Sequence, residues 1–83
     1  MKSIINVLVT SAGGIVGEGI IKSLKFFNKL DDNYKYEITS VDMNPFAVGL
    51  FRTDHGFVVP EANSPDYLDA LIRIIKNQDI DII

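Results

Sequence analysis

The part of the chain best suited to chemistry is a glycine-rich turn between an apolar run and a helix-like stretch. Its candidate ligand-contacting residues are Ser11, Gly13, Gly14 and Gly17. Glycines in such a turn let the backbone bend tightly and let an anion approach the amides at the positive end of the helix. The same glycines would also serve a tight strand-to-helix connection without any ligand, with Gly17 bringing the helix close to the strand. These residues alone do not decide whether the turn contacts a ligand or serves packing only.

The spacing of the turn departs from the dinucleotide-binding fingerprint G-x-G-x-x-G. Ala12 stands where the first glycine belongs, ahead of Gly14 and Gly17. The T-G-x-x-G-x-x-G pattern of short-chain dehydrogenases would instead need a glycine in the place of Ser11. An NAD(P)-binding fragment of a short-chain dehydrogenase or epimerase is therefore an alternative with an imperfect motif.

A second candidate group follows the next strand-like run. Asp42 ends that run 25 residues after Gly17, and in dinucleotide sites an acidic residue about 20 residues after the glycines accepts the ribose hydroxyls. Asp42 and Asn44 would equally well hydrogen-bond the backbone of their own turn ahead of Pro45, as short polar side chains do. Both are predicted substrate- or nucleotide-binding residues, with the turn role as the alternative.

The other polar residues form no catalytic constellation. Asp31 and Asp32 are adjacent, and adjacent side chains seldom converge on one reacting atom. His55 lies in a turn-like Thr-Asp-His-Gly run without a second base nearby, so we predict a surface loop residue. The absence of cysteine and the single histidine argue against a thiolate or histidine-rich metal site. We therefore predict no catalytic residue and no metal site.

The elements that must position these residues alternate between strand and helix signals. The predicted strands are 4–10, 36–42, 56–60 and 80–83, with a short helical turn at 46–51. The first helix is predicted from Ile15 to about Lys29, and a polar loop at 28–35 follows it. Ser64, Pro65 and Asp66 carry the capping signals of a second helix that ends at about Asn77.

Each helix shows an apolar stripe at helical spacing. In the first helix the predicted core-facing residues are Val16, Ile20, Ile21, Leu24 and Phe27. In the second helix they are Leu68, Leu71, Ile72 and Ile75. The lysines of the first helix take other positions, so we predict a solvated face there.

Alternation of strands and helices predicts an α/β fold with a parallel sheet and right-handed crossovers. The expected architecture is a Rossmann-like doubly wound sheet with strand order 3-2-1-4. Because residues 80–83 read as an apolar strand at the chain end, we expect residues 1–83 to be the N-terminal part of a domain, truncated at its fourth strand. The exposed sheet edge would then offer a surface for a homodimer.

Composition limits the partners and the compartment. The net charge is −3 and the eight basic residues are scattered, which argues against nucleic acid. The apolar run after Met1-Lys2-Ser3 is too short for a signal peptide and far too short for a membrane span of about 20 residues. We therefore expect a cytoplasmic protein without a membrane partner.

Three runs of the sequence carry a family resemblance: 7–24, 38–60 and 64–83. Together they are similar to the N-terminal, Rossmann-like pre-ATP-grasp domain of ATP-grasp ligases, and closest in pattern to the carbamoyl phosphate synthase large subunit. The most specific stretch is the D-x-N-P turn that starts at Asp42, followed by A-x-G-L and the Val59-Pro60 pair. Thr53 stands where that family commonly has alanine.

The resemblance implies a function for the protein that carries this domain. ATP-grasp enzymes activate a carboxylate with Mg-ATP, and an amine or another nucleophile then displaces the phosphate. ATP and Mg²⁺ would be held by the remaining ATP-grasp domains, so no cofactor is expected on these 83 residues. The glycine turn would face a small-molecule carboxylate or amine substrate, with Asp42 and Asn44 at the rim. A non-catalytic dimerising module is the third hypothesis.

Overall fold

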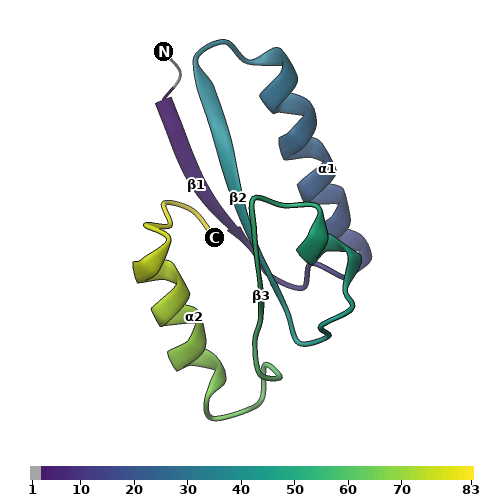
Figure 1. Ribbon diagram of the computed structural model, residues 1–83, viewed down its shortest axis with the longest axis vertical. Helices are drawn as coiled ribbons and strands as arrows, with labels where there is room; N and C mark the ends of the chain where they lie inside the picture. The colour runs from purple at the N-terminus through teal and green to yellow at the C-terminus, as the bar shows by residue number, and fades with distance from the viewer. Residues whose placement is uncertain (1–2) are drawn as a thin grey trace.

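The computed structural model describes residues 3–83. Met1 and Lys2, at the N-terminus that was compared with a signal peptide, lie outside the described residues. Three strands and two α-helices follow one another with one short 3₁₀ helix (Figure 1). Their bounds are β1 (Ser3–Val9), α1 (Ile15–Leu30), β2 (Tyr34–Asp42), η1 (Val48–Phe51), β3 (His55–Val58) and α2 (Tyr67–Asn77). The predicted α/β class is confirmed.

The three strands form one parallel sheet in the order β1-β2-β3. β2 lies in the middle of the sheet. It pairs with β1 along the whole length of β1, from Ser3↔Tyr34 to Val9↔Ser40. β3 pairs only with the last part of β2, from Thr39↔His55 to Asp42↔Val58. The parallel sheet is consistent with a Rossmann-like arrangement.

The predicted fourth strand is not formed, and only one isolated parallel bridge joins Ile82 to Val7. The amide of Leu8 donates to the Ile82 carbonyl at 2.8 Å, while the amide of Asn6 donates to the Asp81 side chain at 2.8 Å. A carboxylate thus takes the place of a backbone acceptor, which interrupts the ladder. The strand order 3-2-1-4 therefore stays a prediction as far as the place of the fourth strand beside β1 is concerned.

Several predicted boundaries shift by a few residues. α1 continues to Leu30 and β2 already begins at Tyr34, because the Asp31 side chain accepts hydrogen bonds from the amides of Asn33 and Tyr34 and closes a short turn. The predicted loop at 28–35 is therefore much shorter. β3 spans 55–58 in place of 56–60, so His55 lies in a strand and not in a loop. Ser64 and Pro65 precede α2 by one turn.

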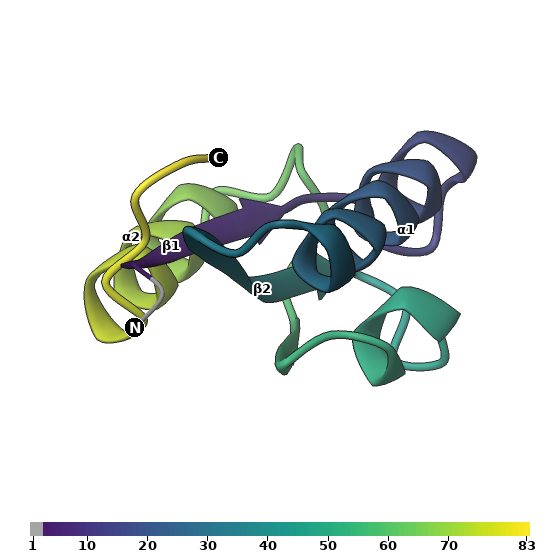
Figure 2. The same ribbon diagram turned by 90° about the horizontal axis from the view of Figure 1, so that it is seen from above.

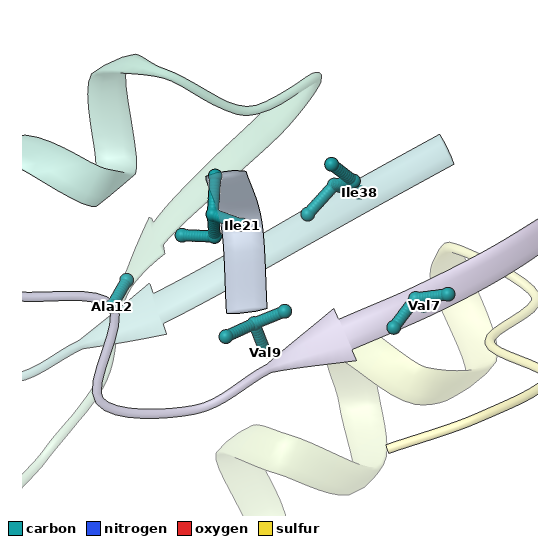
Figure 3. Close-up of a cluster of buried hydrophobic side chains, with 5 residues drawn as sticks. All are labelled: Val7, Val9, Ala12, Ile21 and Ile38. Carbon is teal, nitrogen blue, oxygen red and sulfur yellow. The ribbon is translucent and has the colours of Figure 1, made fainter. Parts of the chain in front are cut away.

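The sheet has a hydrophobic cluster on each face, and the two α-helices lie on opposite sides of it (Figures 1 and 2). On the α1 side the cluster consists of Val7, Val9, Ala12, Ile21 and Ile38, drawn in Figure 3. On the α2 side Leu8, Val41 and Val59 are buried against half-buried residues of α2. Alternate residues of β1 thus serve the two clusters, as the period of a strand requires.

The predicted apolar stripe of α1 was wrong for several residues. The buried residues of the helix are Gly17 and Ile21, whereas Val16 is 74% exposed and Phe27 is 53% exposed. Gly17 lies on the buried side of α1 because it is small. A pattern of apolar side chains does not identify such a residue. In α2, Leu71 and Ile75 of the predicted stripe pack on the cluster together with Ala70 and Ile74. Leu68 of the same stripe is 64% exposed.

The free edge of β2 ahead of its pairing with β3 is covered by side chains. Asn28 makes two hydrogen bonds to the backbone of Tyr36, accepting from its amide at 2.7 Å and donating to its carbonyl at 2.8 Å. Asp54 accepts from the amide of Ile38 at 2.8 Å. These contacts satisfy backbone groups that would otherwise be open to strand pairing.

Gly17 and Gly19 make a matched pair for testing the packing of α1. A Cβ at Gly17 would lie 2.3 Å from the Ser11 carbonyl oxygen, whereas a Cβ at Gly19 would meet nothing within 4 Å. Gly17→Ala should lower the free energy of unfolding by about 1–3 kcal/mol because α1 must move away from the loop. Gly19→Ala should raise it by about 0.5–1 kcal/mol, the usual gain of alanine over glycine in a helix. Urea unfolding followed by circular dichroism measures both, and equal effects would contradict the close approach at Gly17.

Candidate functional site

The candidate site lies where the three parallel strands end. In open parallel α/β sheets, ligands bind in the crevice outside the carboxyl ends of the strands. Here the loop after β1 (10–14), the loop after β2 (43–47) and the segment after β3 (59–66) meet at this end of the sheet. All of the predicted site residues except Gly17 lie in the first two of these loops or at their border.

Asp42 connects the loops after β1 and β2. Its Oδ2 atom accepts a hydrogen bond from the amide of Gly13 at 2.7 Å, and its Oδ1 atom accepts one from the amide of Asn44 at 2.9 Å. Asn44 in turn accepts from the amide of Phe46 at 3.0 Å. The structure thus places Asp42 and Asn44 in the turn-stabilising role, and one amide of the glycine turn already binds a carboxylate of the chain itself.

Ser11 has the backbone conformation that carries this turn. Its φ of 53° lies in the left-handed region, which is uncommon for residues other than glycine, asparagine and aspartate. The carbonyl of Ser11 accepts a hydrogen bond from the amide of Gly14 at 2.9 Å. Such a conformation persists where neighbouring contacts determine it, and it is enriched at binding sites.

The short helix η1 packs against the glycine turn. A Cβ at Gly49 would lie 2.2 Å from the carbonyl oxygen of Ala12, so only glycine permits this approach. Ala12 is fully buried, and its amide donates to the Val41 carbonyl at 3.1 Å. The A-x-G-L stretch of the sequence therefore acts through packing on the turn.

A small cavity of about 220 Å³ opens beside this turn, between the ends of the strands and the start of α2. Ser11, Asp42 and Tyr67 are the polar residues of its lining, and its walls include Val41, Val59 and Pro60. Of the predicted residues, Ser11 and Asp42 line the cavity. Gly13 reaches it only through its bond to Asp42, and Gly14, Gly17 and Asn44 do not line it.

Tyr67, Val59 and Pro60 line the cavity but are not among the site residues predicted from the sequence. Val59 and Pro60 are part of the stretch that carries the family resemblance, which was a usable signal. The sequence contains no signal that marks Tyr67 as a site residue, because an aromatic residue at the start of a helix is most simply explained as a core residue. It also belongs to the cluster on the α2 side.

A larger cavity of about 620 Å³ lies between β1 and α1. Val9, Val16, Ile20, Leu24 and Ile82 are among its mainly apolar lining residues. Its lining includes no charged residue. We assign the candidate site to the smaller cavity, because residues from the ends of all three strands line it.

The remaining titratable residues do not converge on the site. His55 pairs with Glu37 across the sheet, with 3.4 Å between Nε2 and Oε1. Among the described side chains there is no group of three or more His, Cys, Asp or Glu that could hold a metal ion. No helix within residues 3–83 is long and apolar enough to cross a membrane.

A parallel sheet with a helix on each face defines an α/β domain that is consistent with a Rossmann-like sheet. The family described as "PylC-like, N-terminal domain" matches residues 7–83. The chain therefore belongs to this family, a pre-ATP-grasp domain of ATP-grasp ligases. A search of curated proteins finds no match.

The link between the two loops can be tested through Asp42. Asp42→Ala removes the acceptor of two backbone amides, and we expect the free energy of unfolding to fall by about 1–3 kcal/mol. Asp32→Ala, at an exposed position in the turn before β2, is the matched control and should change it by less than about 0.5 kcal/mol. Urea unfolding measures both variants. Equal stabilities of the two would show that Asp42 does not hold the loops together.

Proposed function

We propose that this chain is the substrate-side N-terminal domain of an ATP-dependent carboxylate–amine ligase, of a type similar to the carbamoyl phosphate synthase large subunit. The observation that carries the proposal is the family match over residues 7–83. It is supported by the cavity at the carboxyl ends of the strands, which is the usual ligand position in such sheets. A cytoplasmic location of this ligase is part of the proposal.

In this proposal the domain binds and positions a substrate and carries none of the phosphoryl transfer. That transfer needs metal ligands and cationic clamps on the phosphates. The described residues that line the cavity include no lysine and no arginine. Mg²⁺ and ATP would accordingly be bound by the remaining ATP-grasp domains, and these residues would form one wall of the substrate cleft.

The NAD(P)-binding alternative is less well supported by the geometry. That alternative needs Asp42 to accept the ribose hydroxyls while the glycine turn binds the pyrophosphate. The Asp42 carboxylate instead accepts from Gly13 and Asn44. A pyrophosphate on the same turn would lie against this carboxylate, and the two negative charges would repel each other.

The dimerising alternative depends on open strand edges. Asn28 and Asp54 bind the backbone of β2 along its free part, and Asn6 and Leu8 of β1 bind residues 81 and 82. These contacts leave less of the sheet edge for pairing with a second copy. A homodimer through the sheet edge is therefore the weaker proposal.

The proposal is tested on a longer protein that carries this domain together with its ATP-grasp domains. We expect ADP release from Mg-ATP that depends on both a carboxylate and an amine from a panel of small molecules. NADH binding, followed by fluorescence in parallel, should be absent. NADH binding without substrate-dependent ADP release would overturn the ligase function in favour of an oxidoreductase.

A further inference from the structure

We propose that a cleft between α1 and η1 binds a dianionic phosphate group. The cleft is a cavity of about 340 Å³ between the second half of α1 and residues 51–54, at the end of η1 and just after it. It shares no lining residue with the cavity at the strand ends. The proposal therefore stands independently of the proposed function, and a molecule bound in this cleft would leave the strand ends free.

Three of the eight basic residues of the chain line this cleft. Lys25 and Lys29 are one turn apart on α1, and Arg52 directly follows η1. The lysines of α1 were predicted to form a solvated face, and both of these lysines are exposed. η1 lies beside this part of α1 (Figures 1 and 2), so the fold adds a third cation from a residue distant in the chain.

A hydrogen bond fixes the first of these cations at the cleft. The Nζ atom of Lys25 donates to the Arg52 carbonyl at 3.0 Å, which holds this ammonium group between α1 and the segment after η1. An ammonium group has three donors, so two of them remain for a ligand. Among the described side chains, no carboxylate forms an ion pair with Lys25, Lys29 or Arg52. The positive charges of the cleft are therefore not neutralised by direct partners.

The uncharged polar groups of the lining are bonded within the chain. The side-chain amide of Asn28 accepts from the Tyr36 amide and donates to the Tyr36 carbonyl. The Thr53 hydroxyl group donates to the His55 carbonyl and lies 2.7 Å from the Ser40 hydroxyl group. The donors that remain for a ligand are therefore those of the three cations.

The cleft is positive although the chain as a whole is acidic. Asp54 is the only carboxylate among the described residues that line it, and its Oδ2 atom accepts from the Ile38 amide at 2.8 Å. Three cations thus face one carboxylate, in a chain whose net charge is −3. An anion is attracted to such a lining, whereas a cation is repelled.

The charge and the shape of the donors favour phosphate among the anions. The arginine guanidinium group is a planar fork that matches the oxygens of phosphate and carboxylate, and the lysine ammonium groups act as point charges. A phosphate monoester carries a charge of about −1.5 to −2 at pH 7, so it balances more of the positive charge than a carboxylate does. About 340 Å³ lies at the lower end of the roughly 300–1,000 Å³ of small-molecule sites. Phe51 lines the same cleft and is 75% exposed, which adds apolar surface for the body of an ester.

The test is a ¹⁵N NMR titration of the 83-residue chain with phenyl phosphate, inorganic phosphate and benzenesulfonate. Phenyl phosphate should shift the amides of Lys25, Arg52 and Thr53 with a Kd in the millimolar range, as expected for so small a ligand. Benzenesulfonate has the same ring and a single negative charge, so it should bind about five-fold more weakly. Equal binding of these two probes would overturn the proposal. Shifts confined to the amides of Gly14 and Ile15 would also overturn it, because the start of α1 would then be the anion site.

Inorganic phosphate separates the two sources of the phosphate group. Binding weaker than that of phenyl phosphate assigns the cleft to a phosphate monoester, and equal binding assigns it to the free ion. Both results confirm a phosphate site, whereas the absence of a saturable shift with either phosphate probe refutes it.

Two arginine variants assign the binding to the cleft. Arg52→Gln removes the planar fork and should weaken phenyl phosphate binding by about five-fold or more. Arg73→Gln removes the same charge from α2, outside the lining of the cleft, and should leave the Kd within about two-fold because salt screens distant charges. Equal losses in the two variants would refute a site at the cleft, since binding would then follow the net charge alone.

Asp54→Asn tests the sign of the charge in the opposite direction. The variant removes the one negative charge of the lining and keeps a side-chain oxygen that can accept from the Ile38 amide. We expect phenyl phosphate to bind about two- to three-fold more tightly. Weaker or unchanged binding, in a variant whose spectrum shows the native fold, would contradict an anion held beside Asp54.

Discussion

The hydrogen bond from the Gly13 amide to the Asp42 carboxylate, 2.7 Å long, is the interaction on which this end of the molecule depends. It joins the loop after β1 to the loop after β2, and the second oxygen of Asp42 fixes the turn at Asn44. Below it, the close contact of Gly49 with Ala12 brings η1 against the same loop. Since a charged acceptor makes a stronger hydrogen bond than a neutral one, Asp42 holds the two loops together through its two carboxylate oxygens.

The sheet that carries these loops is covered unequally. On the α1 side Gly17 and Ile21 bring the helix close to the strand ends, and on the α2 side no helix residue is fully buried. Between β2 and η1 the hydroxyl groups of Ser40 and Thr53 lie 2.7 Å apart, and Thr53 also donates to the His55 carbonyl at 3.0 Å. This pair explains why threonine is tolerated at the position where the resembled family commonly has alanine: the hydroxyl of Thr53 is half-buried and has two hydrogen-bond partners.

These features change the chemical role that a glycine-rich turn usually has. Such turns bind anions because their amides point at the ligand. Here the amide of Gly13 already donates to the Asp42 carboxylate, so this amide is bound within the chain itself.

Periodicity, turn signals and a specific local motif were enough to predict the α/β class, the order of the first six elements and the family. The sequence also indicated the close packing at Gly17, but it did not reveal that Val16 and Phe27 of α1 would be exposed. Nor did it reveal that Asp81 would interrupt a fourth strand, or that Tyr67 and Val59 would meet Asp42 at one cavity. Only the tertiary structure decided these points, because each depends on contacts between residues distant in the chain, and local sequence pattern carries no information on such distances.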